Sequence, residues 1–252
     1  MQHIDKNNSV SETSFKAVVD SYITSGCYRY DDISVVDRRK LRGVLGNEQN
    51  GMCAYCMKKV DFDEGTSDHV IPKSIPENEY GRARRHLGQG LYRGDFIWDK
   101  KYTSSSFPCY YPHSLAYGNL VFACADCNAC KDCDLIRPLF FGNPVDGINY
   151  TDKGLLQTAE KDALPQELKT RLNTDLYRYY RCIWRAVKLS GLTVSNLIDA
   201  DNRNSRKQLL KSIQPYVTDS GLLREIVLGA NRFTSDSVWN SLLRFQWFWD
   251  YY

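Results

Sequence analysis

Two pairs of cysteines have the spacing that points most directly to chemistry. The first pair is Cys53-x2-Cys56, and the second is Cys124-x2-Cys127. A Cys-x2-Cys turn presents two sulfurs from one tight bend, and Zn²⁺ prefers four soft ligands at the corners of a tetrahedron. The two pairs therefore predict a structural zinc site with no open position for a substrate. The alternative, that some of these are unliganded buried thiols, is disfavoured by the paired spacing.

The other cysteines leave two further metal sites open. Cys130 and Cys133 continue the second pair at three-residue intervals, which resembles the start of an iron–sulfur motif. That motif has a longer last gap followed by Pro, whereas Asp134 follows here, and it would leave the first pair unexplained. A second zinc site is the other alternative, and its ligands would be Cys109, His113, Cys130 and Cys133. We expect Cys130 and Cys133 instead to be packed or exposed thiols on a helix.

A second group of polar residues lies between and just after the cysteine pairs, and its members are Asp68, His69, Asn119, Asn128 and Lys131. Hydrolysis of a phosphodiester needs an activated water, neutralisation of charge on the phosphoryl oxygens and assistance to the leaving oxygen. A neutral imidazole is suited to accept the proton from water, so His69 is the candidate general base. Neighbouring residues on an extended strand point to opposite faces, so Asp68 can share a site with His69 only where the strand ends or twists.

In order and spacing, these residues resemble the HNH, or ββα-metal, nuclease family. The resemblance covers about residues 50–135 and rests on the segments SDHVIP, GNLVFAC and CNACKD. It implies that Asp68 and Asn128 ligate a catalytic Mg²⁺ or Mn²⁺ ion and that Asn119 fixes the loop orienting His69. It also implies that Lys131 could contact a phosphate. Many family members carry His at the position of Asn128, and Asn keeps an oxygen ligand for a hard cation.

Two other segments, LRGVLGNEQNGMCAYC and FGNPVDGINYTDKG, resemble the HNH subunit of Septu-type antiviral systems, including those carried by some retrons. This narrower resemblance implies an ABC-type ATPase partner and, in a retron, a reverse transcriptase with its nucleic acid. The target would be invading DNA or an RNA such as tRNA. Two alternatives remain: a zinc-stabilised module that binds nucleic acid or protein without cutting, and a stand-alone restriction or homing nuclease.

Composition and charge are compatible with a nuclease and exclude a membrane-spanning class. No apolar stretch approaches the roughly 20 residues that cross a bilayer, and the N-terminus lacks the layout of a secretory signal. We therefore expect a soluble, cytoplasmic protein. The formal net charge of +3 is too small to indicate nucleic-acid binding by itself. From Pro165 onward, however, there are 13 Lys and Arg residues against 8 Asp and Glu residues.

The elements that must position the site can be outlined from periodicity and turn residues. Helical spacing of apolar residues predicts a helix over residues 35–49, which Asn50-Gly51 ends. We expect a short strand over His69–Ile71 that stops at Pro72. Within GNLVFACADCNACKD we expect a second strand, then the second Cys-x2-Cys turn, and then the start of a helix.

Residues 75–118 carry nine aromatic residues but little periodicity, so we expect a long insertion. It would shape substrate access or a partner contact without supplying catalytic ligands. Some of its side chains could stack on and clamp a nucleic-acid strand, namely Arg82, Arg84, Arg85, Trp98 and Tyr102.

One long helix is predicted from Pro165 to Ser190, with Gly191 just past its end. Its apolar face comprises Leu168, Leu172, Leu176, Tyr179, Ile183 and Val187. Its basic face comprises Arg171, Arg178, Arg181, Arg185 and Lys188. With no acids balancing it in the sequence pattern, the basic face could follow a phosphate backbone. The alternatives are a solvated face and a docking surface for the ATPase.

The expected fold class is α+β, with a small zinc-stapled ββα-metal core, flanking helices and a helical C-terminal region. The expected domains are an N-terminal helical segment at 1–49, the nuclease core at 50–140 with its insertion at 75–118, and the helical region at 141–252.

Overall fold

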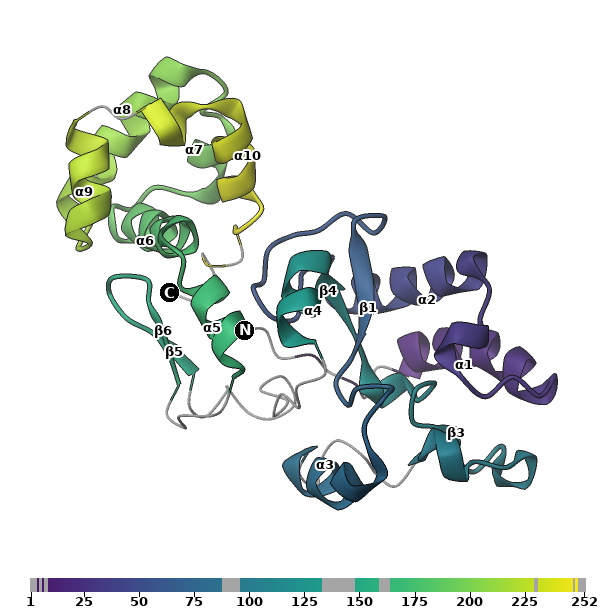
Figure 1. Cartoon of the computed structure of the whole chain (residues 1–252). Helices are drawn as coiled ribbons and strands as arrows, with labels where there is room; N and C mark the ends of the chain where they lie inside the picture. The colour runs from purple at the N-terminus through teal and green to yellow at the C-terminus, as the bar shows by residue number, and fades with distance from the viewer. Residues whose placement is uncertain are drawn as a thin grey trace. The chain divides into compact units, whose positions relative to one another are not determined.

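The computed structural model describes residues 9–87, 96–132, 148–158, 164–228 and 231–246, together with residues 4, 6 and 248. The fold is α+β, as expected (Figure 1). The chain divides into two compact units, which are described separately. The first comprises Met1–Gly147 and Ala159–Leu168, and the second comprises Ile148–Thr158 and Lys169–Tyr252. The division falls within helix α5 (Gln166–Leu172).

The first unit contains four α-helices and four strands within its described residues. They are α1 (Ser9–Thr24), α2 (Val35–Glu48), β1 (Gly65–His69), α3 (Tyr80–Leu87), β2 (Phe96–Ile97), β3 (Tyr111–Pro112), β4 (Leu120–Cys124) and α4 (Ala125–Lys131). Short 3-10 helices occupy Tyr30–Asp32, Glu77–Glu79, Asp99–Lys101, Ser104–Ser106 and Tyr117–Asn119.

The centre of this unit is an antiparallel pair of strands covered by a helix. β1 pairs with β4 in a register that runs from Gly65 opposite Cys124 to His69 opposite Leu120. Every residue of β4 is buried, and α4 follows it directly and lies beside both strands (Figure 1). The β1 backbone approaches β4 closely, since a Cβ at Gly65 would lie 2.1 Å from the ring of Phe122. The sequence predicted a strand over His69–Ile71. The observed strand, β1, lies earlier in the chain and ends at His69, the residue at which the predicted strand begins.

Helix α2 confirms the helix predicted over residues 35–49. The Ser34 hydroxyl accepts a hydrogen bond from the Asp37 amide at 3.1 Å and begins the helix. Beyond its end, Asn50 and Gly51 have φ of 54° and 71°, the left-handed conformation that ends helices. Leu41 and Leu45 are fully buried on the inner face.

The segment 75–118 is not a detached insertion. It forms α3 and a parallel pairing of β2 with β3, and its last part, Leu115–Tyr117, is buried in the first unit. Trp98 is buried and stacks on Tyr80 with ring centroids 4.0 Å apart, and Tyr102 is buried too. Neither ring is free to stack on a nucleic-acid strand, so that expectation is wrong for both.

Among the predicted clamp arginines, Arg82 is exposed, with Nη1 3.3 Å from a Glu79 carboxylate oxygen. The side chains of Arg84 and Arg85 lie outside what the structure describes.

The second unit contains a two-stranded antiparallel hairpin and a group of helices. They are β5 (Ile148–Tyr150), β6 (Leu156–Thr158), α6 (Asp175–Leu189), α7 (Val194–Ile198), α8 (Arg203–Ile213), α9 (Ser220–Val227) and α10 (Asp236–Leu243). Short 3-10 helices occupy Gln214–Tyr216 and Asn231–Thr234. The largest fully buried aromatic side chains of the unit are Tyr180, Trp184, Phe233, Trp239, Phe245 and Phe248.

The single helix predicted from Pro165 to Ser190 is two helices. α5 ends at Leu172 and α6 begins at Asp175, after an N-cap at Thr174. Between them, the Asn173 side chain bonds to both backbone groups of Leu156 in β6, which holds the break in place. The predicted apolar face is otherwise buried, except that Leu176 is only half-buried.

The basic face predicted on this segment is largely neutralised. Arg181 is 0% exposed and donates to the carbonyls of Gly154 and Leu172, at 2.7 Å each. Arg178 pairs with Asp219 at 2.5 Å, and Arg185 pairs with Asp152 at 2.8 Å. Arg178 also pairs with Asp175 in the same helix, at 2.8 Å. Three of the five predicted cations are therefore used within the unit, which leaves Arg171 and Lys188 for the surface predicted from the sequence.

Within the described residues, no helix is both long enough and apolar enough to cross a membrane.

Candidate metal centre and active site

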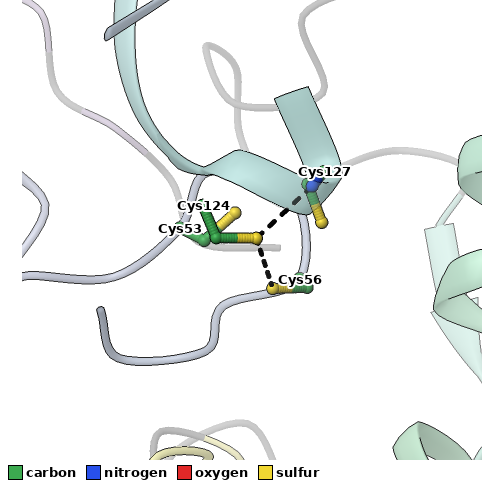
Figure 2. A group of neighbouring side chains, drawn as sticks. All are labelled: Cys53, Cys56, Cys124 and Cys127. Atoms are coloured by element: carbon green, nitrogen blue, oxygen red, sulfur yellow. Dashed lines mark hydrogen bonds between the residues drawn. The ribbon is translucent and has the colours of Figure 1, made fainter. Parts of the chain in front are cut away.

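The two cysteine pairs converge as the spacing predicts. Cys53 and Cys56 lie in the loop before β1, and Cys124 and Cys127 lie where β4 passes into α4 (Figure 2). All four are buried, and their sulfurs lie within 4.8 Å of one another. Cys56 Sγ is 3.9 Å from Cys124 Sγ. Tetrahedral zinc with Zn–S bonds of about 2.3 Å places sulfurs about 3.8 Å apart, so the cluster has the size of a Zn²⁺ site.

Backbone amides support both cysteine turns. The Tyr55 amide donates to Cys53 Sγ, and the Cys127 amide donates to Cys124 Sγ, at 3.4 Å each. The second of these bonds also makes Cys124 the N-cap of α4. Hydrogen bonds from the neighbouring thiols lower the pKa of Cys124, whereas burial raises the pKa of Cys53 and hydrogen bonding to Cys124 raises that of Cys127. The protein alone therefore favours one thiolate in the cluster, at Cys124.

The alternative metal sites gain no support from the described residues. The four-cysteine cluster is the only group of three or more Cys, His, Asp or Glu side chains there that could hold an ion. Cys109 is exposed, Cys130 is half-buried, and His113 is buried against Asp99, with Nδ1 2.8 Å from the carboxylate. Cys133 lies outside the described residues.

A cavity of about 620 Å³ opens beside the end of β1 in the first unit. Among the predicted site residues, those that line it are Asp68, His69, Asn128 and Lys131. Asp68 and His69 reach one cavity although they are adjacent, because β1 ends at His69. The sequence alone left this arrangement undecided.

The ring of His69 is held in a defined orientation. Nε2 lies 3.0 Å from the carbonyl oxygen of Ser114, so Nε2 carries the proton and donates it. This leaves Nδ1 as the unprotonated nitrogen, and it has no hydrogen-bond partner among the described residues. Burial lowers the pKa of His69 to about 3, so the ring is neutral at physiological pH. A neutral imidazole with a free lone pair can accept a proton.

Asn119 ties together the two backbone segments that flank His69. Its Oδ1 accepts from the Ile71 amide at 2.7 Å, and its Nδ2 donates to the carbonyls of Ile71 and His113, at 3.1 and 2.8 Å. One segment follows His69 directly, and the other carries Ser114, whose carbonyl orients the ring. Asn119 is fully buried and does not line the cavity. Its hydrogen bonds hold the loops on both sides of the candidate base.

Asp68 is buried between Tyr55 and Lys131. The Tyr55 hydroxyl donates to Oδ2, and Lys131 Nζ lies 3.5 Å from Oδ1. Burial raises the pKa of Asp68, and the Lys131 ammonium opposes the rise. Burial also raises the pKa of Tyr55 well above its usual range, so the phenol remains the donor.

Lys131 differs from the expectation of a phosphate contact. Its side chain is only 1% exposed, and its ammonium donates to the His69 carbonyl at 2.7 Å. The ammonium is used inside the protein, where it holds the His69 backbone and balances the charge of Asp68. Asn128, one helical turn earlier, is half-buried and lines the cavity.

Carboxylate and amide oxygens are the ligands that Mg²⁺ prefers, and this cation commonly takes one or two protein ligands beside water and phosphate. Asp68 and Asn128 supply that donor set at one cavity, so their chemistry fits such an ion.

Sequence reasoning missed the residues that support the site. Ser114 acts through its backbone carbonyl, and Asp99 Oδ1 accepts from the Ser114 amide at 3.0 Å. His113 contacts Asp99 in turn. A backbone carbonyl leaves no signal in a side-chain pattern, and Tyr55 lies inside a cysteine motif whose spacing says nothing of the intervening residues.

Four further cations line the cavity, namely Arg29, Arg38, Lys73 and Lys100, together with the carboxylates of Asp31, Asp99 and Asp132. Lys73 pairs with Asp31 at 2.6 Å. Arg29, Arg38 and Lys100 have no ion pair among the described residues, whereas the next two cations of α2, Arg39 and Lys40, pair with Asp63 and Asp37. Unpaired cations beside a cavity favour an anionic ligand.

No model of a known protein family matches the chain, and no curated protein or solved structure matches it either.

Proposed function

We propose that the chain is a metal-dependent endonuclease of the HNH, or ββα-metal, type that hydrolyses phosphodiester bonds of DNA or RNA. The observation that carries the proposal is the arrangement around the cavity. Asp68 and His69 lie at the end of β1, and Asn128 reaches the same cavity from α4. A four-cysteine cluster joins the loop before β1 to the junction of β4 and α4.

In this proposal His69 is the general base. Its Nε2–H is committed to Ser114, so Nδ1 accepts the proton of the attacking water. A proton on the ring would be disfavoured in the free protein, because burial holds the pKa of His69 to about 3. A bound phosphodiester would place negative charge nearby and favour the protonated ring as the reaction proceeds.

Asp68 and Asn128 would hold the catalytic cation. A divalent ion bound there would neutralise charge on the phosphoryl oxygens and assist the departing oxygen. Tyr55 and Lys131 hold Asp68 in place before substrate arrives, so the carboxylate needs no reorganisation. The zinc bound by the cysteines would do no chemistry and would stabilise the junction that carries Asn128.

The unpaired cations support a polyanionic substrate. Arg29, Arg38 and Lys100 lie beside the reacting groups and could contact phosphates on either side of the scissile bond. Lys131 is not assigned to this role because its ammonium is already used by the His69 carbonyl.

The Septu-type assignment remains a proposal that rests on the sequence segments alone. It names an ABC-type ATPase as partner and, in a retron, a reverse transcriptase with its nucleic acid. The test is to tag this chain, purify it from cells that also make the proposed partners without tags, and ask whether an ABC-type ATPase is purified with it. A stand-alone nuclease would cut without any associated protein.

The proposal is tested by incubating the zinc-loaded chain, alone and with any associated ATPase, with DNA and with RNA. We expect cleavage with Mg²⁺ and none with a chelator of Mg²⁺. Asp68→Ala should lose cleavage, and excess Mn²⁺ should partly restore it. A chain that binds nucleic acid but cuts neither polymer under all these conditions would be the binding module instead.

A further inference from the structure

Tyr55 belongs to two sites at once. Its backbone lies inside the turn formed by Cys53 and Cys56, and its amide donates to Cys53 Sγ at 3.4 Å. Its side chain is 0% exposed, and its hydroxyl donates to Asp68 Oδ2. One residue of the zinc-binding turn therefore contacts the carboxylate at the end of β1.

The zinc turn itself is anchored to the central strands. The Ala54 amide donates to the Phe122 carbonyl in β4 at 2.9 Å, and Cys124 at the end of β4 lies in the same cluster of sulfurs. The position of the Tyr55 ring is thus fixed by the metal cluster and by β4, while Asp68 is carried by β1. The hydrogen bond from the phenol to Asp68 joins these two parts.

We infer that Tyr55 is a positioning residue that couples the zinc-binding turn to the catalytic cation site. This inference rests on the proposed function, because it takes Asp68 as a ligand of the cation. Each carboxylate oxygen has two lone pairs, so a hydrogen bond from Tyr55 leaves Asp68 free to bind an ion. The phenol selects one orientation of the carboxylate, which Lys131, 3.5 Å from the other oxygen, does not fix alone.

The expected effect is large enough to measure. Residues that hydrogen-bond to metal ligands typically change metal affinity by about 10- to 100-fold when they are replaced. Tyr55→Phe removes only the hydroxyl, so the ring still fills its buried space and the cysteine turn keeps its amide bond to sulfur. We therefore expect zinc to remain bound while the cation affinity at Asp68 falls by about 10- to 100-fold.

The test titrates Mn²⁺ into the zinc-loaded full chain without substrate and follows free Mn²⁺ by electron paramagnetic resonance. Tyr111→Phe is the matched control, because the Tyr111 hydroxyl donates to the Asp20 carboxylate at 2.7 Å in the same unit, away from the cavity. Zinc content is measured in parallel. We expect Tyr55→Phe to weaken Mn²⁺ binding and Tyr111→Phe to leave it unchanged.

The outcomes separate this inference from the proposed function. If Tyr55→Phe and the parent bind Mn²⁺ equally while Asp68→Ala does not, the coupling is wrong and the cation site stands. If the parent binds no Mn²⁺, or if the parent and Asp68→Ala bind Mn²⁺ with equal affinity, the proposed cation site is wrong. The coupling through Tyr55 is then wrong as well.

If Tyr55→Phe fails to retain zinc, Tyr55→4-aminophenylalanine takes its place, because it keeps both the ring and a donor. Parent-like Mn²⁺ affinity then supports the positioning role. A loss of affinity in that variant, with zinc retained, overturns it.

Discussion

Replacing Lys131 by Met tests whether this lysine is an internal support of the site. Met keeps most of the aliphatic volume but removes the ammonium that donates to the His69 carbonyl at 2.7 Å and faces Asp68 at 3.5 Å. A hydrogen bond to a charged group contributes about 1.5–3 kcal/mol. Breaking a buried pair by removing one partner costs about 3–5 kcal/mol, because a buried charge is left uncompensated.

The assay is urea unfolding of the zinc-loaded chain at fixed zinc concentration. With slopes of about 1–3 kcal/mol per molar urea, a loss of this size lowers the midpoint by one molar or more. Lys40→Met is the matched control, since Lys40 pairs with Asp37 at 2.7 Å but is exposed. We expect the control to move the midpoint little, because solvent screens exposed pairs.

A second variant identifies the cause of the loss. Adding Asp68→Asn to Lys131→Met removes the uncompensated carboxylate, so the double variant should lose less stability than the sum of the two single variants. If Lys131→Met shifts the midpoint no more than Lys40→Met, the ammonium faces solvent. The phosphate contact expected from the sequence would then be the better interpretation.

Three shorter predictions address the metal and the candidate base. Elemental analysis should find about one zinc per chain, and Cys53→Ser should lose it together with the fold, whereas iron with labile sulfide would exclude the zinc site. Because burial lowers the pKa of His69 to about 3, nitrogen NMR should find its ring neutral and protonated at Nε2 at pH 5. The stability that depends on this neutral ring should be present above pH 6.5 and decline as the pH falls toward 3; a titration centred near 6.5 would contradict the buried placement. Asp99→Ala removes the acceptor of the Ser114 amide, so it should slow cleavage without changing Mn²⁺ affinity, and a parallel loss of both would argue against a role through His69 alone.

The parts of the fold that depend on local spacing could be predicted from the sequence. The cysteine turns are local, so their spacing predicted a cluster whose sulfurs do converge. Helix α2 has apolar residues at helical intervals and a clear end at Asn50 and Gly51. Helix α1 carries a comparable signal, because Phe15, Val19 and Ile23 lie four residues apart and are all buried.

The parts that depend on distant segments could not be predicted in the same way. β1 consists of the residues GTSDH, which have little intrinsic preference for a strand, and it forms because β4 pairs with it. Arg185 looks unbalanced in the sequence because its acid, Asp152, lies 33 residues away. Arg178 pairs with Asp175, three residues away, and also with Asp219, 41 residues away, which no local pattern indicates. Arg181 is likewise buried because its guanidinium donates to the carbonyls of Gly154 and Leu172. The helical periodicity of the sequence cannot predict these partners.

Single-turnover cleavage by His69→Ala tests the central claim most directly. The substitution removes the proposed base but none of the cysteine ligands and neither proposed cation ligand, so zinc content and Mn²⁺ binding should be retained. A general base contributes roughly 100- to 10,000-fold, so strand cleavage with Mg²⁺ should fall by that factor while nucleic-acid binding persists. The measurement uses the substrate and any associated ATPase with which the parent is active. A His69→Ala protein that cuts as fast as the parent would contradict the assignment of His69, and with it the HNH mechanism proposed for this chain.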